Sequence, residues 1–248
     1  MLNIVIPMAG RGSRFQDAGY AFPKPLIEIK GKTMIEVVIN NLKPKCDHKF
    51  IFICQKEHYE KYDLYNVLKN ATDNKFEIIQ IDGITEGAAC TVLTATQYIN
   101  DEDELLIANS DQFVEIDMDD FIKTGRSEGR DGLIMTFPSS HPKWSYARVD
   151  ENGVVIEVAE KKVISDKATV GIYYFKKGSD FVSNDQNMIE KNIRFNNEFY
   201  VCPVYNELIL KDKKICIYDI DIKKMHGLGT PEDLNEFLKK LEEGKVTV

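Results

Sequence analysis

The alternation of short apolar runs with longer amphipathic stretches is the feature that most constrains the fold of this chain. In the first half, each apolar run of strand length is followed by a stretch whose apolar residues recur at helical spacing. The expected strands are residues 4–7, 50–54, 76–80 and 105–108, and the expected helices are residues 33–42, 59–68 and 88–98. Because a strand–helix–strand order favours parallel pairing, it predicts a mainly parallel sheet with helices on both faces.

The second half of the chain has strands in quick succession, which predicts an added antiparallel element. These strands are expected at residues 133–137, 146–149, 154–158 and 169–175. The turn Asp150-Glu151-Asn152-Gly153 is typical of a hairpin in which Asn and Gly supply the positive φ angles. The predicted fold is therefore α/β: a Rossmann-like mixed, mainly parallel sheet flanked by helices, with an antiparallel β element.

The end of the chain has a clear helix signal, and no segment reads as a linker. Thr230 is a favourable N-cap, and Pro231 suits the first helical position. The expected apolar face consists of Leu234, Phe237, Leu238 and Leu241. Since there is neither a repeat nor a low-complexity stretch, residues 1–248 are predicted to form a single domain.

Charge and cysteine content exclude several classes of protein. There are 32 Lys and Arg against 40 Asp and Glu, a net charge of −8, which argues against binding to nucleic acid or anionic membranes. No apolar run approaches the roughly 20 residues of a membrane span, and the first residues lack a basic signal-peptide region. Five scattered cysteines and four scattered histidines suit neither a disulfide framework nor a zinc site. A cytoplasmic protein with reduced thiols is expected.

A glycine-rich loop, Gly10-Arg11-Gly12-Ser13-Arg14, follows the first expected strand. Glycines in such a place let backbone N–H groups approach phosphate oxygens. The dinucleotide-binding fingerprint is excluded because Phe15 stands where its third glycine belongs. A P-loop is excluded because Leu26 stands where the glycine before Gly31-Lys32 belongs. The loop therefore predicts a phosphate site of another kind.

Two basic residues reinforce this prediction. Arg14 ends the loop, and Lys24 follows between Pro23 and Pro25. Prolines restrict the backbone and so reduce the entropy lost when the lysine is aimed at a ligand. An arginine and a lysine on one loop can together hold a polyphosphate.

These two segments resemble the sugar-1-phosphate nucleotidyltransferases, also called nucleotide-sugar pyrophosphorylases. That family has an apolar strand, then G-x-G-[ST]-R-[LMF], then P-K-P-[LM], which read here as GRGSRF and PKPL. The likeness extends over nearly the whole chain. It implies a magnesium-dependent reaction in which a phosphorylated acceptor attacks a nucleoside triphosphate and releases pyrophosphate.

The resemblance also implies roles for individual residues. It assigns catalysis to Arg14, Lys24 and Asp111, with Asp111 as the Mg²⁺ ligand. Asp111 follows a parallel strand, where its hard carboxylate would point into the crevice that α/β proteins use for ligands. The implied nucleotide-binding residues are Met8, Ala9, Gly10, Gly12, Ser13, Gln80, Gly87 and Ala88, and the implied acceptor-binding residues are Glu160, Lys161, Gly171 and Glu198.

The chain departs from the family near its end. Many members carry Asp-x-Gly-Thr, whose Asp is the second metal ligand, but here Gly227 stands in that position. Asp219 and Asp221 lie slightly upstream, where either is a candidate replacement, as is a water molecule.

Three alternatives therefore stay open. The first is a cytidylyltransferase acting on a phospho-alcohol, with Trp144, Tyr146, Tyr173 and Tyr200 as a candidate aromatic box for a quaternary ammonium. The second is a GT-A type glycosyltransferase, and the third is a nucleotide sensor without catalysis. The sequence does not select the base, the acceptor or the oligomeric state, a homo-oligomer being one option.

Overall fold

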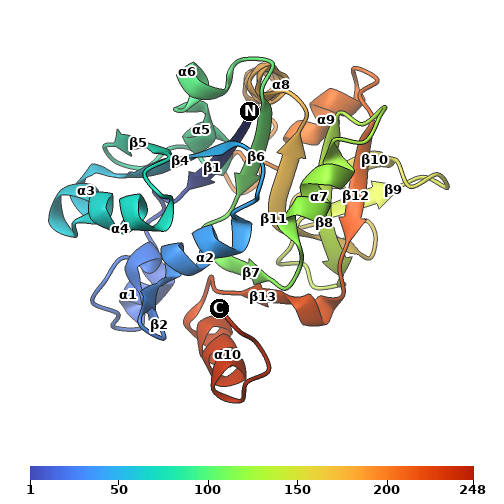
Figure 1. Cartoon of the computed structure of the whole chain (residues 1–248). Coiled ribbons are helices and arrows are strands. Elements are labelled where there is room, and N and C mark those ends of the chain that lie inside the picture. Colours follow the sequence, from blue (N-terminus) through green and yellow to red (C-terminus); the bar gives the residue numbers. More distant parts are fainter.

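The computed structural model describes residues 1–248 and is built around a nine-stranded mixed sheet (Figure 1). Its strands are β1 (Leu2–Pro7), β4 (His48–Gln55), β5 (Phe76–Ile81), β6 (Glu104–Ala108), β8 (Gly132–Pro138), β9 (Tyr146–Val149), β10 (Val155–Ala159), β11 (Lys167–Phe175) and β12 (Ile215–Asp219). β1 pairs in parallel with both β4 and β6, and β4 pairs in parallel with β5. β11 runs antiparallel between β6 and β8. The predicted mixed, mainly parallel sheet with an antiparallel part is thus confirmed.

Alternating side chains of the central strands build two separate apolar cores. Ile4 and Ile6 of β1 belong to the larger core, whereas Val5 between them belongs to the smaller one. Because successive side chains of a strand point to opposite faces, the two cores lie on opposite sides of the sheet. All three residues are fully buried, as strands covered by helices on both faces require.

Helices cover both faces of the sheet. Those whose buried residues join the larger core are α2 (Met34–Leu42), α4 (Leu64–Ala71), α7 (Met118–Gly125) and α10 (Pro231–Glu242); those that join the smaller core are α5 (Ala88–Leu93), α8 (Gly178–Glu190) and α9 (Val204–Ile209). Shorter helices are α1 (Ser13–Asp17), α3 (Lys56–Lys61), α6 (Thr96–Ile99) and the 3₁₀ turns η1 (Lys24–Leu26) and η2 (Ile222–Lys224). The helix predicted after Thr230 has its expected cap, since the Asp233 N–H donates to the Thr230 hydroxyl at 3.1 Å.

Two helices that were expected to be continuous are each broken in two. The helix expected at 59–68 is divided into α3 and α4 at Asp63, which has a φ of 48°. The helix expected at 88–98 is divided into α5 and α6, where the hydroxyls of Thr94 and Thr96 donate to the carbonyls of Thr91 and Leu93. Such side-chain bonds compete with the helical backbone pattern, which explains the second break.

The β9–β10 hairpin is present, but its turn differs from the prediction. Only Gly153 has a positive φ, of 77°. The Asp150 carboxylate accepts instead from the N–H groups of Asn152 and Val154, both at 2.9 Å. The Asx turn made by Asp150 therefore replaces the positive φ that was expected of Asn152.

Two small sheets were not predicted. β2 (Glu28–Ile29) and β3 (Lys32–Thr33) form a hairpin around Gly31, and β7 (Gln112–Val114) pairs antiparallel with β13 (Met225–Gly227). The second pairing brings the end of the chain beside the segment that leaves β6, with α10 directly below it (Figure 1). It therefore decides which residues surround Asp111.

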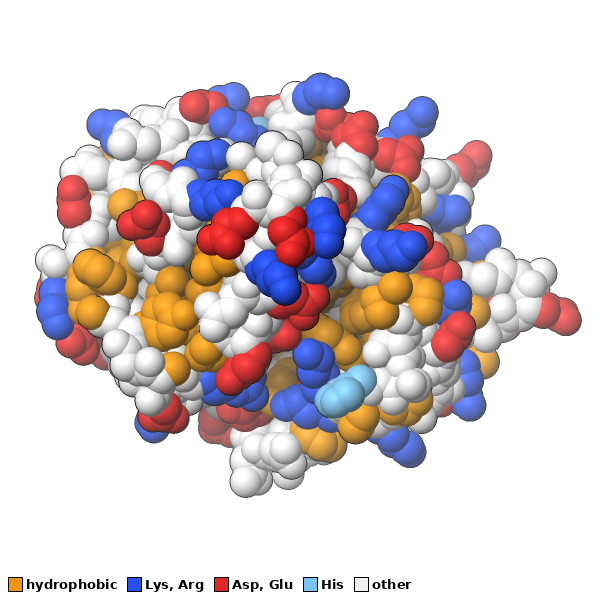
Figure 2. Space-filling model, turned by 90° about the horizontal axis from the view of Figure 1, so that it is seen from below, with side chains coloured by type: hydrophobic (Ala, Val, Ile, Leu, Met, Phe, Trp, Pro, Cys, Tyr) orange, Lys and Arg blue, Asp and Glu red, His pale blue; other side chains and the backbone are white.

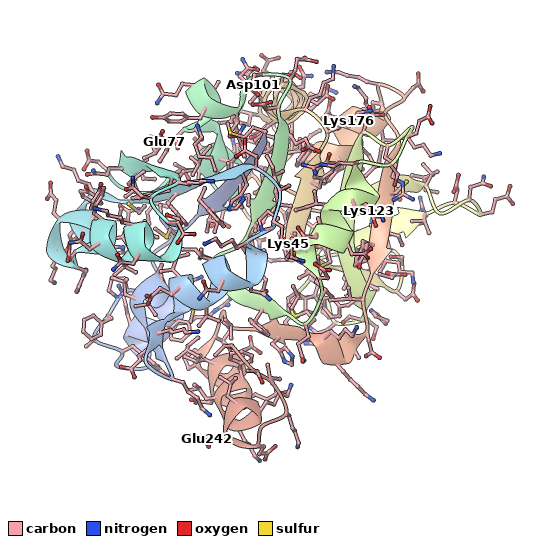
Figure 3. All side chains as sticks on the ribbon, in the orientation of Figure 1. Lys45, Glu77, Asp101, Lys123, Lys176 and Glu242 are labelled. Atoms are coloured by element: carbon pink, nitrogen blue, oxygen red, sulfur yellow. The ribbon has the colours of Figure 1, made fainter.

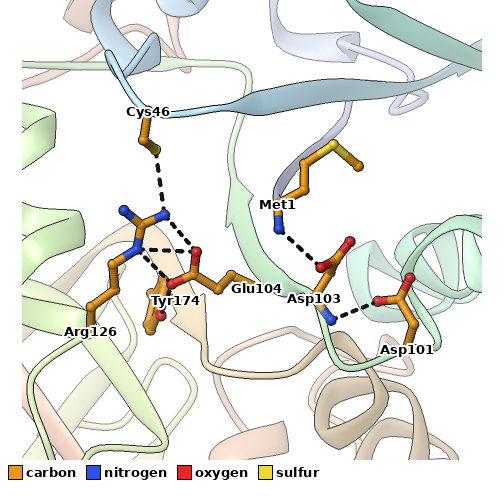
Figure 4. Close-up of polar contacts among 7 residues, drawn as sticks. All are labelled: Met1, Cys46, Asp101, Asp103, Glu104, Arg126 and Tyr174. Carbon is orange, nitrogen blue, oxygen red and sulfur yellow. Dashed lines mark hydrogen bonds and ion pairs between the residues drawn. The ribbon is translucent and has the colours of Figure 1, made fainter.

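A charged cluster holds the opposite end of β6 (Figure 4). Glu104 accepts three hydrogen bonds from the Arg126 guanidinium, of 2.8, 3.1 and 2.6 Å, which tie β6 to the residue after α7. The amino group of Met1 lies 2.9 Å from Asp103. This cluster is at the beginning of β6, whereas Asp111 follows its end, so we regard the cluster as structural.

The surface shows no extended field of one charge on the face seen from below, where acidic and basic side chains are interspersed (Figure 2). Charged residues at the rim, such as Glu77, Asp101 and Glu242, point outward (Figure 3). No helix combines the length and the apolar character needed to cross a bilayer.

Asp185 on α8 makes stability depend on pH. Its side chain is fully buried, neither carboxylate oxygen has a hydrogen-bond partner, and burial raises its pKa to about 7. The folded state thus keeps a proton that the unfolded state, with a pKa of about 3.9, has lost. The free energy of unfolding is therefore expected to fall between pH 4 and pH 7, by at most about 1.4 kcal/mol per pH unit from this group.

Thermal unfolding measured from pH 5 to pH 8 tests this expectation. Asp185→Asn should flatten the pH dependence, whereas Asp212→Asn, at an exposed position, should leave it as in the parent protein. Equal slopes for the parent protein and Asp185→Asn would contradict the assignment.

Candidate active site

The carboxyl ends of β1 and β6 lie side by side because the two strands are parallel neighbours. The glycine-rich loop follows β1, and Asn109, Ser110 and Asp111 follow β6. The N–H groups of Gly10, Arg11 and Gly12 form no hydrogen bonds within the chain. This edge of the sheet therefore presents free donors next to a carboxylate.

Lys24 and Asp111 meet directly at this edge. The Lys24 ammonium lies 2.9 Å from Asp111 Oδ2, although 87 residues separate them in sequence. Lys24 opens η1, where Pro25 and Leu26 are buried and anchor the turn. Gly12 leaves room for the lysine, since a Cβ on Gly12 would lie 3.3 Å from Lys24 Cβ. The predicted lysine and carboxylate thus share one site.

A small open cavity of about 230 Å³ surrounds this pair. Its lining residues are Gly12, Ser13, Arg14, Phe15, Lys24, Asp111 and Gly229. Two cations and one carboxylate line it, so its formal charge is positive. Such a cavity can hold anionic phosphate groups.

A second cavity of about 210 Å³ has Lys24 in common with the first. Its lining combines the loop residues Met8, Ala9 and Gly10 with Pro7, Lys24, Ile81, Ile84, Thr85, Gly87, Ala88, Thr91, Ser110, Glu198 and Tyr200. The apolar and small residues could hold a flat ring. Gln80 is exposed on β5 and does not line this cavity; the neighbouring Ile81 does.

Gly87 connects this cavity to a distant segment of the chain. It has a φ of 126°, and a Cβ there would lie 2.3 Å from the carbonyl oxygen of Phe199. That oxygen accepts from the Ala89 N–H at 3.1 Å, and the Phe199 N–H donates to Glu86 at 2.7 Å. Only glycine can therefore occupy this position without displacing the backbone of residues 198–200.

Gly87→Ala is accordingly expected to lower the free energy of unfolding by about 3 kcal/mol, since both the backbone strain and the clash must be relieved. Gly83→Ala is the matched control, because Gly83 also has a positive φ, of 76°, but nothing lies within 4 Å of its Cβ position. The control should cost about 1 kcal/mol. Chemical denaturation measures both, and equal losses would contradict the contact argument.

Two of the residues expected to bind the acceptor, Lys161 and Glu198, are linked through the Tyr200 hydroxyl. Lys161 donates to the Tyr200 hydroxyl at 2.8 Å, and that hydroxyl donates to Glu198 at 2.7 Å. Lys161 also lies over the Tyr200 ring, 4.6 Å from its centre. Burial and the nearby Glu198 raise the pKa of Tyr200 above its usual value, so its proton stays in this chain of hydrogen bonds.

Glu160 and Gly171, also expected to bind the acceptor, line neither of the two cavities. Burial raises the pKa of Glu160, and the Ser145 hydroxyl donates to its carboxylate. Gly171 has a φ of 94°, and a Cβ there would lie 2.2 Å from the Asn109 amide nitrogen. Gly171 therefore lets Asn109 pack closely against β11, next to the segment that carries Asp111.

Sequence reasoning missed several residues of this site. Ser110, Thr85, Ile81 and Ile84 line the second cavity, and Gly229 lines the first. Tyr200 was noted only as a candidate for an aromatic box. That box does not form: Tyr146 and Tyr173 are buried, and Trp144 lines a separate cavity with Phe137.

Asp111 is the one carboxylate that lines the first cavity. Asp219 is held by Thr136 and Lys167 at 2.5 and 2.6 Å, and Asp221 caps η2, so both alternatives suggested by the sequence are engaged elsewhere. Gly227 lines the separate cavity of Trp144, where Asp233 lies 3.5 Å from its Cβ position. No group of three potential ligands occurs in the chain. Asp111 still fits Mg²⁺, which is often held by one carboxylate together with substrate phosphates.

Comparison with known proteins agrees with this arrangement. The family model described as nucleotidyl transferase matches residues 4–241. The chain belongs to the nucleotidyl transferase family. The Lys24–Asp111 pair and the glycine-rich loop lie within the matched part.

Individual relatives of this nucleotidyl transferase are distant. D-glycero-alpha-D-manno-heptose 1-phosphate guanylyltransferase of Campylobacter jejuni is 26% identical over 96% of this chain and 99% of its own. Bifunctional protein GlmU of Methanocaldococcus jannaschii is 27% identical over 71% of this chain, which spans only 40% of that relative. Among solved structures, the nucleoside-diphosphate-sugar pyrophosphorylase of Vibrio cholerae RC9 has a TM-score of 0.81 and 28% identity, over 95% of this chain and 99% of its own.

Proposed function

We propose that this chain transfers a nucleotidyl group from a nucleoside triphosphate to a sugar 1-phosphate, giving a nucleoside-diphosphate sugar and pyrophosphate. The observation that carries the proposal is the position of Lys24, which lies against Asp111 and lines both cavities. A cation at the junction of two ligand sites can neutralise the charge that develops as phosphate attacks phosphate. Family membership and the guanylyltransferase relative support the same reaction.

In this mechanism, the glycine-rich loop and Arg14 hold the β- and γ-phosphates. The free N–H groups of Gly10, Arg11 and Gly12 supply hydrogen bonds, and Arg14 adds a charge-assisted contact. The base lies in the second cavity, against the backbone of Gly87 and Ala88. This placement leaves the α-phosphate beside Lys24.

The acceptor lies toward Glu160 and Lys161. Glu160 accepts from sugar hydroxyls, and Lys161, positioned by Tyr200, binds the acceptor phosphate. That phosphate attacks the α-phosphorus, and the bond to the pyrophosphate oxygen breaks. No general base is needed, because a phosphate monoester with a second pKa of about 6 is mostly dianionic at neutral pH. Mg²⁺, held by Asp111, would supply further charge neutralisation at the phosphates.

The first experiment combines the protein and Mg²⁺ with one nucleoside triphosphate and a pool of sugar 1-phosphates and phospho-alcohols. ATP, GTP, CTP, UTP and dTTP are tested separately, and pyrophosphate release is measured by a coupled assay. Guanylyl transfer to a sugar 1-phosphate is the first reaction to examine, because a relative that aligns with nearly the whole chain is named as a heptose 1-phosphate guanylyltransferase.

Release that requires one triphosphate and one acceptor supports the proposal and identifies both substrates. If release requires CTP and a phospho-alcohol, the chain is a cytidylyltransferase whose acceptor is a phospho-alcohol and not a sugar 1-phosphate. Triphosphate binding without release from any pool would indicate a sensor. Binding of a nucleotide sugar alone would indicate a glycosyltransferase.

A further inference from the structure

The Gln55 side chain ties together two loops that line the second cavity. Gln55 is the last residue of β4, which lies between its parallel neighbours β1 and β5 (Figure 1). Its Nε2 donates to the carbonyl oxygens of Ala9, in the loop after β1, and Gly83, in the loop after β5, each at 2.6 Å. Carbonyl oxygens only accept, so the amide must turn its nitrogen, with both N–H donors, toward them. One half-buried side chain thus bridges the two loops.

The bond to Ala9 fixes the direction of the next N–H group. The Ala9 carbonyl and the Gly10 N–H belong to one peptide unit, and the chain has no cis peptide bond. In a trans peptide, the C=O and N–H bonds point in opposite directions. The Gly10 N–H therefore points away from Gln55. It forms no hydrogen bond within the chain, and Gly10 lines the second cavity.

The bond to Gly83 has the same consequence on the other loop. The Gly83 carbonyl shares a peptide unit with the Ile84 N–H, which also has no partner within the chain. Ile84 lines the second cavity as well. Gly83 has a φ of 76°, and the freedom of a glycine makes this loop costly to hold in one conformation. The hydrogen bond from Gln55 restricts it.

We propose that Gln55 is a positioning residue of the nucleotide site. By holding the carbonyls of Ala9 and Gly83, its amide presents the N–H groups of Gly10 and Ile84 together to acceptor atoms of a bound nucleoside triphosphate. Gln55 lines neither cavity itself and acts through these two peptide units. Donors that are already oriented cost less to order on binding, so losing the bridge weakens nucleotide affinity. This inference deepens the proposed function and rests on it for the class of ligand.

Titration of triphosphates into the protein without any acceptor tests this proposal. MgATP, MgGTP, MgCTP, MgUTP and MgdTTP are titrated separately by isothermal titration calorimetry, and the one that binds most tightly is used for the variants. Gln55→Glu keeps the shape of the side chain but places an oxygen against both carbonyls. Its Kd is expected to rise at least about tenfold, because two hydrogen bonds are lost and like groups face each other. Gln55→Met removes the donors without adding charge and should raise Kd by about three- to tenfold; it serves as the test if the glutamate variant does not fold.

The matched control is Gln97→Glu. Gln97 is exposed on α6 and lines neither cavity, and its substitution makes the same change in net charge. It should leave Kd as in the parent protein, which separates loss of the bridge from the screened effect of a distant negative charge on an anionic ligand.

The kinetic constants separate positioning from a merely structural role. With the substrate pair identified in the first experiment, KM for the triphosphate should rise with Kd in the Gln55 variants. KM for the acceptor should stay unchanged, because both hydrogen bonds of Gln55 go to the loops of the second cavity. A merely structural role would lower the temperature of unfolding and leave the affinity of the folded protein unchanged.

Unchanged Kd in the folded Gln55 variants would overturn the proposal, as would an equal loss of affinity in Gln97→Glu. Because binding is measured without an acceptor, the result does not depend on pyrophosphate release. A parent protein that bound the triphosphate but released no pyrophosphate would contradict the proposed function and leave the effect of Gln55 on binding standing.

Discussion

Replacing Lys24 with alanine is expected to lower turnover by about 10²-fold or more, the loss associated with one preorganised charge contact in a transition state. Lys24 is the one lysine that lines both cavities, and its ammonium is already aimed by Asp111 at the junction between them. Its flanking prolines reduce the cost of holding it there. The measurement is kcat for pyrophosphate release with the substrate pair found in the first experiment.

Lys32→Ala is the matched control, because Lys32 lies on the β2–β3 hairpin and lines neither cavity. It should keep near-parent turnover. If Lys24→Ala did so too, the assignment of Lys24 would be wrong.

Asp111→Asn is expected to reduce turnover by a similar factor, and additional Mg²⁺ should not restore it. Asparagine is nearly isosteric, so the backbone bond from the Leu228 N–H to the Asp111 carbonyl, of 2.8 Å, can remain. The change removes the negative charge that both orients Lys24 and suits a hard cation. Turnover is measured while Mg²⁺ is raised well above its saturating concentration for the parent protein.

Asp117→Asn provides the comparison for this variant. Asp117 caps α7 by accepting from the Asp119 N–H at 2.9 Å, and asparagine is an equally good N-cap. It should therefore retain normal turnover and stability. Full recovery of Asp111→Asn at high Mg²⁺ would show that Asp111 only raises metal affinity, which would contradict its role in orienting Lys24.

The segment from Phe195 to Tyr200 contacts residues proposed to bind the nucleotide and residues proposed to bind the acceptor. Phe199 is bonded to the residues around Gly87 on the nucleotide side, and Tyr200 is bonded to Lys161 on the acceptor side. Displacing this segment should therefore affect both substrates together. Gly87→Ala is expected to displace the same segment, because the added Cβ would lie 2.3 Å from the Phe199 carbonyl oxygen.

Local sequence was sufficient for the features whose causes are local. The buried strand before Gly10, the cap of α10 at Thr230 and the hairpin after β9 follow from hydrophobic period and turn chemistry. The loop–lysine segment that resembles the nucleotidyltransferases lies within residues 10–26, so it could be read directly. Family membership confirms that reading.

Contacts between distant residues were decided only by the tertiary structure. The approach of Lys24 to Asp111 depends on β1 and β6 being neighbours, and the bond from Lys161 to Tyr200 spans 39 residues. The outward position of Gln80 depends on the register between β4 and β5. The separate cavity beside Gly227 depends on the pairing of β7 with β13. Residue type and spacing determine which groups can do the chemistry. Long-range packing determines which of these groups meet, because the packing energy comes from residues that are far apart in the sequence.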